Sequence, residues 1–592
     1  MQILGHSQTI GVSQMINCII NGIPVSVPDG STILDAARTL GIEIPTLCFL
    51  REINEIGDCR ICVVEVKGSR NLVNSCVYPV SEGMEIKTNT DRVFKARKTT
   101  LELILSTHDR KCLSCIRSGN CELQRLCKDF KVDDELKYEG EMPRYEYDDT
   151  AVHMYRDDNK CILCRRCVSA CEKWQSVGVI GANDRGFHTH IGCAFDQNLG
   201  DVPCVSCGQC IVVCPTGAIA EKDQTGEVWE ALEDPSKHVI VQTAPSIRVT
   251  LGDAFGMRIG TNVEGKMVAA LRRLGFDQVF DTNVAADLTI IEEANEFVER
   301  VKNGGVLPMI TSCSPGWVKF CEYYFPEFIP NLSTCKSPQQ MFGAMAKTWY
   351  AKRTGIDPKD IFVVGIMPCT AKKFEKTREF EAASGLPDVD VALTTRELAR
   401  MINRAGINFS ILPDEKYDDP FGVATGAGVI FGATGGVMEA ALRTAYEQIT
   451  GSEPPSLDFT FVRGTKGIKE AVYKVGDLDV KVAAVSGLAN ARALLESIKR
   501  GEKEYHFIEI MACPGGCVNG GGQPVVSAAT RNFVDLKALR AKSLYEKDQD
   551  MKLRKSHENP VLKVIYDEFL EHPGSHIAHK TLHTDYVRRN RL

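Results

Sequence analysis

Two stretches of the sequence share one cysteine spacing: CILCRRCVSAC at 161–171 and CVSCGQCIVVC at 204–214. Each reads Cys-x2-Cys-x2-Cys-x3-Cys, and Pro215 follows the last cysteine of the second stretch. The chain has 24 cysteines among 592 residues, and most of them lie before residue 215 in comparably tight groups. Disulfides explain such groups in small secreted proteins, whereas a long chain of ordinary composition uses them to bind metal. The sequence therefore predicts a front part built around metal centres.

The repeated spacing resembles that of a bacterial two-cluster ferredoxin. In that module the first three cysteines of a run hold one [4Fe–4S] cluster, and the fourth crosses to the other cluster. The resemblance implies two ligand sets, which are Cys161, Cys164, Cys167 with Cys214, and Cys204, Cys207, Cys210 with Cys171. Cys127 and Cys193 lie outside these patterns and are expected to be free thiols.

Upstream of this module, residues 16–27 alternate apolar and polar side chains around Asn21-Gly22, which is a strong hairpin signal. A short helix is expected to follow and to end at Gly41. Four cysteines come next at Cys-x10-Cys-x2-Cys-x13-Cys spacing: Cys48, Cys59, Cys62 and Cys76. Four thiolates could also bind zinc. The hairpin and helix favour the alternative, because the whole stretch resembles a [2Fe–2S] ferredoxin domain of the β-grasp fold.

A charged amphipathic helix is expected at 91–107, and a mixed ligand set follows it: His108, Cys112, Cys115 and Cys121. In isolation this set favours a zinc site. Its place between two cluster modules favours a [4Fe–4S] cluster instead. The set resembles the histidine-ligated module shared by hydrogenases and the large iron–sulfur subunit of respiratory NADH dehydrogenases. An imidazole that replaces a charged thiolate is expected to raise the potential of such a cluster.

The character of the sequence changes at about residue 236. A buried strand is expected at 239–242, and helices at 262–274, 287–302 and 336–353 alternate with apolar runs. This alternation indicates α/β layering.

Three motifs lie within this body: TSCSPGW at 311–317, MPCTAKK at 367–373, and EIMACPGGC at 509–517, which leads into three glycines at 520–522. They resemble the three signatures of [FeFe]-hydrogenases, and the similarity extends over nearly the whole chain from residue 16. One motif alone would be weak, but their order behind four cluster modules is specific. The resemblance implies an enzyme that catalyses H2 ⇌ 2 H+ + 2 e−.

The H-cluster of that family is a [4Fe–4S] cubane bridged by a cysteine to a two-iron unit with CO, cyanide and azadithiolate ligands. The resemblance makes Cys369, Cys513 and Cys517 ligands of the cubane, with Cys517 as the bridge. Around the two-iron unit it implies that Lys372 pairs with one cyanide ligand and that Pro245 and Ser246 occupy the positions of the backbone and hydroxyl donors to the other. It also implies that Met367 and Met511 pack against the unit and that Phe431 forms part of the pocket wall. The glycines at 520–522 suit close backbone approach to the cofactor.

The first signature departs from the family pattern. The family usually has Cys-Cys-Pro, whereas this chain has Cys313-Ser314-Pro315. By position, Cys313 is the proton relay and Ser314 occupies a place that ligates the cubane. Serine can bind iron as an alkoxide, but it is a poorer ligand for iron–sulfur chemistry. Alternatively Cys313 serves as the ligand and loses its relay role.

A route for protons is also implied by the resemblance. Glu293, Glu296, Arg300 and Ser333 match the family's relay between the surface and the cluster, together with Cys313. A thiol of ordinary pKa, about 8.5, can exchange protons with an amine. The alternative for Glu296 and Arg300 is a surface ion pair at i,i+4 on a helix. Three further cysteines are expected to be core thiols: Cys18, Cys321 and Cys335.

The bulk composition excludes several classes. The net charge is −7 and no basic block stands out, so we expect no nucleic-acid partner. The first 15 residues lack the apolar core of a signal peptide, and no apolar run is long enough to span a membrane, so a cytoplasmic location is expected. A complex I-type electron-transfer subunit would share the front modules but lack the three later motifs. A hydrogen sensor or non-catalytic relative stays open because of Ser314.

The expected architecture is a multidomain α+β front followed by an α/β hydrogenase domain. The boundaries are 16–92 for the [2Fe–2S] ferredoxin domain, 93–135 for the His/Cys3 module, 151–222 for the two-cluster module and 236–592 for the H-cluster domain. The expected cofactors are one [2Fe–2S] cluster, three accessory [4Fe–4S] clusters and the H-cluster. No nucleotide or flavin motif is evident, so nicotinamide chemistry would need partners. Expected partners are ferredoxin or NAD(P)H-diaphorase-type flavoprotein subunits in a hetero-oligomer.

Overall fold

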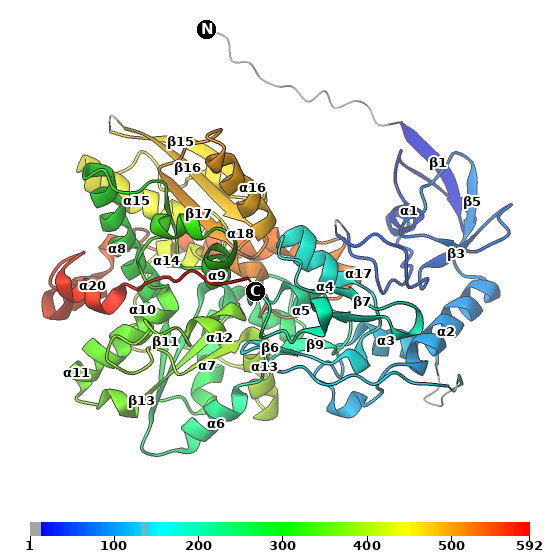
Figure 1. Ribbon diagram of the computed structural model, residues 1–592, viewed down its shortest axis with the longest axis horizontal. Helices are drawn as coiled ribbons and strands as arrows, with labels where there is room; N and C mark the ends of the chain where they lie inside the picture. The colour runs from blue at the N-terminus through cyan, green and yellow to red at the C-terminus, as the bar shows by residue number, and fades with distance from the viewer. Residues whose placement is uncertain (1–13, 52, 133–136, 139, 477, 592) are drawn as a thin grey trace, which may run out of the picture.

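The structure is a computed structural model that describes residues 14–51, 53–132, 137–138, 140–476 and 478–591. Residues 1–13, in which we expect no secretory signal, lie outside this description. Figure 1 shows a small N-terminal domain at one end of the long axis, cluster-binding modules in the middle and a large α/β body at the other end. Within the described ranges, the helices all fall short of the length and apolar content that a membrane span requires.

The N-terminal domain is a five-stranded sheet in the order β2-β1-β5-β3-β4. Its strands are β1 (Met15–Ile20), β2 (Ile23–Pro28), β3 (Val63–Val66), β4 (Val73–Asn74) and β5 (Met84–Lys87). Asn21 and Gly22 form the turn of the predicted hairpin with φ of 53° and 87°, as a two-residue turn between twisted strands requires. Thr32 caps helix α1 (Ile33–Thr39), which packs on the sheet.

The middle of the molecule is poor in regular structure. Helix α2 (Asp91–Ser106) and helix α3 (Glu122–Asp129) flank the His/Cys3 set. The two-cluster module has two short helices, α4 (Arg166–Ser169) and α5 (Gln209–Val213). It also has two short antiparallel strand pairs. Strand β6 (Met154–Arg156) pairs with β9 (Ile219–Glu221), and β7 (Gly181–Asn183) pairs with β8 (His190–Gly192). Arg165 and Gly208 precede α4 and α5 with φ of 59° and 68°. These left-handed residues curl each cysteine run around a central space.

The body contains two four-stranded sheets. The first has the order β11-β10-β13-β14 and is parallel throughout. The second has the order β12-β17-β16-β15, in which only the edge strand β15 is antiparallel. Their strands are β10 (His238–Thr243), β11 (Gln278–Asp281), β12 (Met309–Ile310), β13 (Ile361–Met367), β14 (Val391–Thr394), β15 (Ile468–Val475), β16 (Leu478–Ser486) and β17 (Phe507–Met511).

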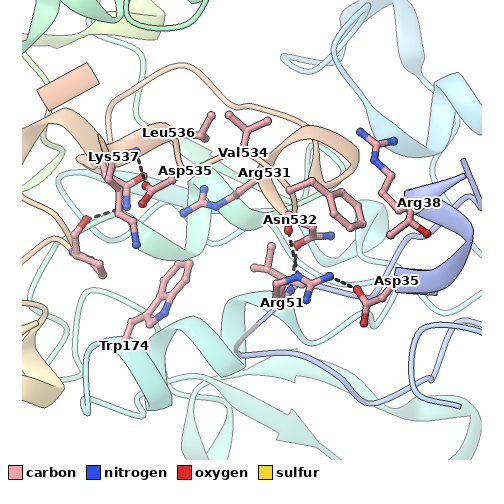
Figure 2. Close-up of a pocket in the computed structure, with 15 residues that line it drawn as sticks. Asp35, Arg38, Arg51, Trp174, Arg531, Asn532, Val534, Asp535, Leu536 and Lys537 are labelled. Carbon is pink, nitrogen blue, oxygen red and sulfur yellow. Dashed lines mark hydrogen bonds and ion pairs between the residues drawn. The ribbon is translucent and has the colours of Figure 1, made fainter. Parts of the chain in front are cut away.

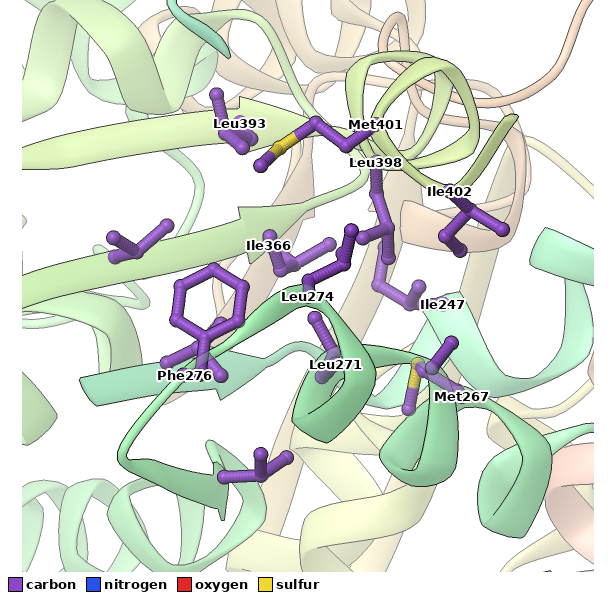
Figure 3. Packing of buried hydrophobic residues seen from close by; sticks show 14 of the residues in the cluster. Ile247, Met267, Leu271, Leu274, Phe276, Ile366, Leu393, Leu398, Met401 and Ile402 are labelled. Carbon is purple, nitrogen blue, oxygen red and sulfur yellow. The ribbon is translucent and has the colours of Figure 1, made fainter. Parts of the chain in front are cut away.

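Helices cover both sheets of the body. They are α6 (Thr225–Glu233), α7 (Glu264–Leu274), α8 (Asn283–Lys302), α9 (Pro315–Tyr324), α10 (Pro338–Met345), α11 (Ala351–Thr354), α12 (Ala371–Glu375), α13 (Thr395–Arg404), α14 (Gly426–Ile430), α15 (Gly436–Thr450), α16 (Leu488–Lys499), α17 (Ala528–Arg531), α18 (Leu536–Asp550), α19 (Pro560–Ile565) and α20 (His576–Leu582). The helix expected at 336–353 is divided by a π-helical turn at Ala346–Tyr350. Figure 3 shows one apolar core, in which α7 and α13 pack on the first sheet. Its long parallel strands are buried on both faces, which is why they read as continuous apolar runs.

A cleft of about 590 Å³ lies where the N-terminal domain, the two-cluster module and the body meet (Figure 2). Arg51 crosses it: its backbone N donates to Asn532 Oδ1 at 2.9 Å, and its guanidinium pairs with Asp35. Trp174 and Arg531, from the module and the body, line the same cleft. Polar contacts therefore tie the N-terminal domain to the body.

Candidate functional site

Strands of both body sheets end at one cavity of about 80 Å³. The loops that follow β10, β12, β13 and β17 deliver Pro245, Cys313, Cys369 and Cys513 to its wall. Ligands of open α/β sheets bind at the carboxyl ends of the strands, so the position is typical of a cofactor or substrate site.

The cavity brings together the thiols that the sequence assigned to the H-cluster. Cys313, Cys369, Cys513 and Cys517 all line it, and so does Ser314. Ser314 precedes α9, and its Oγ accepts a hydrogen bond of 3.1 Å from the backbone N of Ala512. The hydroxyl is thus held against the loop that carries Cys513.

The buried position of the cavity's thiols shifts their pKa values. Burial raises the pKa of each of its thiols, to about 12 for Cys517 and well above the ordinary range for Cys313. Met367, Phe431 and Met511 form apolar parts of the wall. Ligation of a metal cluster would therefore require these thiols to release their protons.

Lys372 supplies the cation of this cavity. Its Nζ donates to the carbonyl of Cys313 at 3.3 Å and pairs with both carboxylate oxygens of Glu375 at 2.9 Å. Glu375 also accepts hydrogen bonds from Ser337 and Gln339. The sequence analysis missed Glu375, although its i,i+3 spacing from Lys372 on a helix was a usable signal.

Of the remaining residues expected to contact the cofactor, some line the cavity and others lie beside it. Pro245 lines the cavity, whereas Ser246 is buried beside it and its hydroxyl accepts a hydrogen bond of 3.2 Å from Gln523. Gly520 lines the cavity, but Gly521 packs on the two-cluster module: a Cβ there would lie 2.1 Å from the carbonyl oxygen of Cys207. The glycine run therefore serves contact between modules as well as approach to the cavity.

Three of the expected proton-route residues, Glu296, Ser333 and Arg300, are joined by hydrogen bonds, and Glu293 lies on the same helix as Glu296. Glu293 is buried, and neither of its carboxylate oxygens has a close hydrogen-bond partner among the described residues. Burial raises the pKa of Glu293 to about 8, and the nearby charge of Glu296 adds to the shift. Glu296 accepts from Ser333 Oγ at 3.0 Å and from Arg300 at 2.6 Å. The side chains of Glu296 and Arg300 are only 14% and 13% exposed, so this is not a free surface pair.

The eight cysteines of the two repeated runs line two small cavities, four at each. One is lined by Cys161, Cys164, Cys167 and Cys214, and the other by Cys171, Cys204, Cys207 and Cys210. These are the two crossed sets that the two-cluster spacing implies. The chain path brings the fourth cysteine of each run beside the first three of the other run.

The N-terminal set also converges. Cys62 Sγ lies 3.3 Å from Cys76 Sγ, while the backbone N of Cys48 donates to Cys59 Sγ at 3.4 Å and that of Cys59 donates to Cys48 Sγ at 3.5 Å. Cys48 and Cys59 share a hydrogen bond, which lowers the pKa of Cys59 and raises that of Cys48, so the two thiols share protons between them.

In the His/Cys3 module, the Nδ1 atom of His108 is buried without a hydrogen-bond partner among the described residues. Burial lowers the pKa of His108, so the ring is neutral and able to bind a metal. Cys127, expected to be a free thiol, lies close enough to Cys112 and Cys121 for their charges to raise its pKa, together with burial, to about 12.

Hydrogen bonds connect the candidate cluster sites. Asn54 Nδ2 donates to the carbonyl of Cys48 at 2.7 Å and to that of Cys164 at 2.9 Å. Arg117 donates to the carbonyl of Cys214 at 3.0 Å. These links join the N-terminal and His/Cys3 sites to the two-cluster module, and sequence reasoning found neither.

Family comparisons agree with this layout. The description "iron only hydrogenase large subunit, C-terminal domain" matches residues 237–521, and "iron hydrogenase small subunit" matches 534–589. In the front part, a 2Fe-2S cluster binding domain matches 13–91, the iron–sulfur binding region of NADH-ubiquinone oxidoreductase-G matches 97–135, and a 4Fe-4S dicluster domain matches 160–218.

Individual relatives extend over the whole chain. The chain is 51% identical to the NADP-reducing hydrogenase subunit HndD of Solidesulfovibrio fructosivorans over 98% of its own length and 100% of that protein's. It is 44% identical to iron hydrogenase 1 of Clostridium pasteurianum over 97% of this chain and 100% of that protein. The structure matches a variant of the [FeFe]-hydrogenase HydA1 of Chlamydomonas reinhardtii with a TM-score of 0.56 and 41% identity, over 62% of this chain and 99% of that chain. The chain therefore belongs to the [FeFe]-hydrogenase family, with iron–sulfur cluster domains preceding the hydrogenase domain.

Proposed function

We propose that this chain is the H2-activating subunit of an NAD(P)-linked hydrogenase and catalyses H2 ⇌ 2 H+ + 2 e− at the cavity lined by Cys313. The observation that carries the proposal is that the cavity's thiols lie between a candidate route for protons and a candidate route for electrons. The buried group of Glu293, Ser333 and Glu296 leads away on one side. On the other side, Gly521 lies against Cys207 of the two-cluster module.

The donor set fits the H-cluster at most of its positions. Cys369, Cys513 and Cys517 would hold the cubane, and Cys517 would bridge to the two-iron unit. Ser314 would take the fourth ligand position, because it lies in the same cavity wall and its hydroxyl is held there by a hydrogen bond from Ala512 N. When bound, the clusters supply the irons at which H2 is cleaved and the redox centres that carry its electrons.

The chain's own side chains would hold and move the proton. The Cys313 Sγ stays protonated near neutral pH because burial raises its pKa, so it can pass on one proton only as it takes up another. Glu293, with a pKa of about 8, can hold or release a proton near physiological pH, as a relay group must. Ser333 and Glu296 would then extend the route to Arg300 near the surface.

On the electron side we propose four accessory clusters. The ligands would be the N-terminal cysteine set for [2Fe–2S], His108 with its three cysteines for one [4Fe–4S], and the two crossed sets for two more. The links through Asn54 and Arg117 support two entry branches that meet at the two-cluster module.

We also propose that the electrons pass to partner subunits in a hetero-oligomer, either an NAD(P)H-diaphorase-type flavoprotein or ferredoxin. Support comes from the NADP-reducing hydrogenase whose subunit is 51% identical over 98% of this chain. A cytoplasmic location would suit a chain that uses most of its 24 cysteines as proposed cluster ligands rather than in disulfides.

The test is infrared spectroscopy of anaerobically purified, matured protein, with H2 uptake assayed on the same sample. CO and cyanide bands together with turnover are the expected result. A Ser314→Cys variant, examined beside the natural chain, shows what the hydroxyl contributes. If the natural chain lacks the bands while Ser314→Cys has them, the chain is a sensor or electron-transfer relative.

A further inference from the structure

Three ligand types of different chemistry meet beside the proposed proton route. One ligand atom each from Glu296, Cys335 and His583 lies within 4.8 Å of the others. Cys335 is fully buried, as expected of a core thiol, but it lies beside two other groups that can bind a metal. Its Sγ lies 3.8 Å from Glu296 Oε2.

The backbone fixes this grouping. Cys335 and His583 face each other in an antiparallel bridge, which Lys336 N and Thr584 N close by donating to the carbonyls of Leu582 and Thr334. Opposed residues of such a bridge project side chains to the same face, a few ångströms apart. Glu296 approaches that face from α8, so three separate segments supply the ligands.

The distances suit a tetrahedral metal. Zinc binds Cys sulfur at about 2.3 Å and carboxylate oxygen at about 2.0–2.2 Å, which puts the two ligand atoms about 3.6 Å apart. The observed 3.8 Å between Cys335 Sγ and Glu296 Oε2 is close to that value. A thiol and an imidazole also favour zinc or a similar cation over magnesium or calcium, which prefer oxygen ligands alone.

The surroundings of His583 complete the arrangement. Its Nε2 lies 3.4 Å from Glu292 Oε2, and its Nδ1 lies 2.7 Å from Thr334 Oγ1. A metal-binding histidine usually donates its other ring N–H to a carboxylate, which is the role that buried Glu292 can fill for Nε2. Nδ1 is then the metal-binding nitrogen, and it exchanges its contact with Thr334 Oγ1 for the cation. The exposed His579 ring stacks on His583 at 4.0 Å between centroids, so the group lies just beneath the surface.

A second cluster of acidic residues in the described part of the chain is not a candidate metal site. Glu439, Asp458 and Asp548 also lie within 4.8 Å of one another. Three guanidinium groups, from Arg443, Arg463 and Arg554, already pair with them. That group is an ion-pair network, whereas at Glu296 the Arg300 guanidinium contacts Oε1. Glu296 Oε2 accepts hydrogen bonds from Ser333 Oγ and Thr334 N, pairs with no cation among the residues that the structure describes, and lies beside Cys335 Sγ.

We propose that Glu296, Cys335 and His583 form a binding site for a divalent transition-metal cation of the Zn²⁺ class, and that its occupancy inhibits the enzyme. Binding releases the Cys335 thiol proton to solvent. It also takes up Glu296 Oε2, the atom that accepts the hydrogen bond from Ser333. The inhibition, but not the site, rests on the proposed function.

The binding test uses matured, cluster-loaded enzyme, washed with chelator and equilibrated with Zn²⁺ alone. Zinc and iron are counted together, so that zinc in cluster sites would appear as lost iron. Zinc-edge X-ray absorption then reports the ligands. We expect one zinc with a single sulfur neighbour in the natural chain and in Cys321→Ala, a control thiol that is equally buried elsewhere. Cys335→Ala should lose the sulfur neighbour, and it and His583→Gln should bind zinc at least about tenfold more weakly.

Equal zinc affinity in Cys335→Ala, or a zinc without sulfur neighbours in the natural chain, would overturn the site. A zinc titration of H2 uptake tests the inhibition. Uptake should fall over the same zinc range as binding, with the midpoint at least about tenfold higher for Cys335→Ala. Zinc bound at full activity would overturn the inhibitory role. An enzyme inactive before zinc is added would instead contradict the proposed function, while the binding result still decides the site.

Discussion

Gln209 Nε2 donates a hydrogen bond of 2.9 Å to the carbonyl oxygen of Asn519. Gln209 lies between two cysteines of the two-cluster module, and Asn519 follows Cys517 by two residues. Both residues are buried. The bond therefore joins the ligand loop of an accessory cluster to that of the proposed H-cluster.

Replacement of this glutamine should separate two activities. In Gln209→Leu the Asn519 carbonyl loses its donor, at a cost of about 1–3 kcal/mol in the free energy of unfolding. We expect slower H2 uptake with an acceptor reduced at the front clusters, while H/D exchange, which needs only the cavity, stays unchanged. The exposed Gln197, changed to Leu, is the control from the same module. An equal fall of both activities would show that the cavity itself depends on the bond.

The close backbone contact at Gly521, between the same modules, leaves no room for a side chain. A Cβ at Gly521 would lie 2.1 Å from Cys207 O and 2.6 Å from Gly208 Cα. Gly521→Ala should lower the free energy of unfolding by about 1–3 kcal/mol, because backbone atoms on both sides must move apart. Thermal unfolding measures the loss. Gly226→Ala, which meets no atom within 4 Å, should be neutral or slightly stabilising.

Glu293 should be required for turnover without being required for cluster binding. Glu293→Gln keeps the size of the side chain but cannot accept or release the relayed proton. H2 uptake should fall by about 10²–10⁴-fold with iron content and infrared bands unchanged. Glu299→Gln, an exposed change on the same helix, should leave uptake intact. Full activity of Glu293→Gln would exclude this carboxyl from the route.

The same variant should alter how stability depends on pH. The folded pKa of Glu293 is about 8 against an ordinary 4.5, so between these values the folded chain keeps a proton that the unfolded chain has lost. Its contribution to the free energy of unfolding therefore falls as pH rises through this window. The free energy of unfolding of Glu293→Gln minus that of the natural chain, measured by denaturant titration, should increase from pH 5 to pH 9 by at most roughly 4 kcal/mol. A difference that is flat or decreases with pH would contradict the burial argument.

Sequence patterns were informative where the structure depends on neighbours in the chain. The Asn21-Gly22 hairpin is confirmed because a two-residue turn is fixed by its own residues. The tight cysteine runs likewise predicted groupings that the structure brings around two cavities. The α/β layering of the body is also confirmed, since long apolar runs identify strands buried on both faces.

Contacts between distant segments could not be predicted in this way. Gln523 and Ser246 are 277 positions apart, and Asn54 and Cys164 are 110 apart. Nothing local marks such partners, because their meeting depends on how whole modules pack. Cys335 illustrates the limit: burial was expected, but its position opposite His583 depends on a bridge between segments that lie far apart in the chain.

The order of the cavity's residues along the chain bears on biosynthesis. The accessory sites are complete once residue 214 has been made, whereas the cavity receives Cys513 and Cys517 only in the last part of 592 residues. A ribosome thus releases the front modules long before the pocket can close. Helix α18, which packs on α14 and on the turn at Cys517–Asn519, emerges later still. Under the proposed function, the accessory clusters consequently have all their ligands before residues 513–550, which complete and cover the catalytic cavity, have been made.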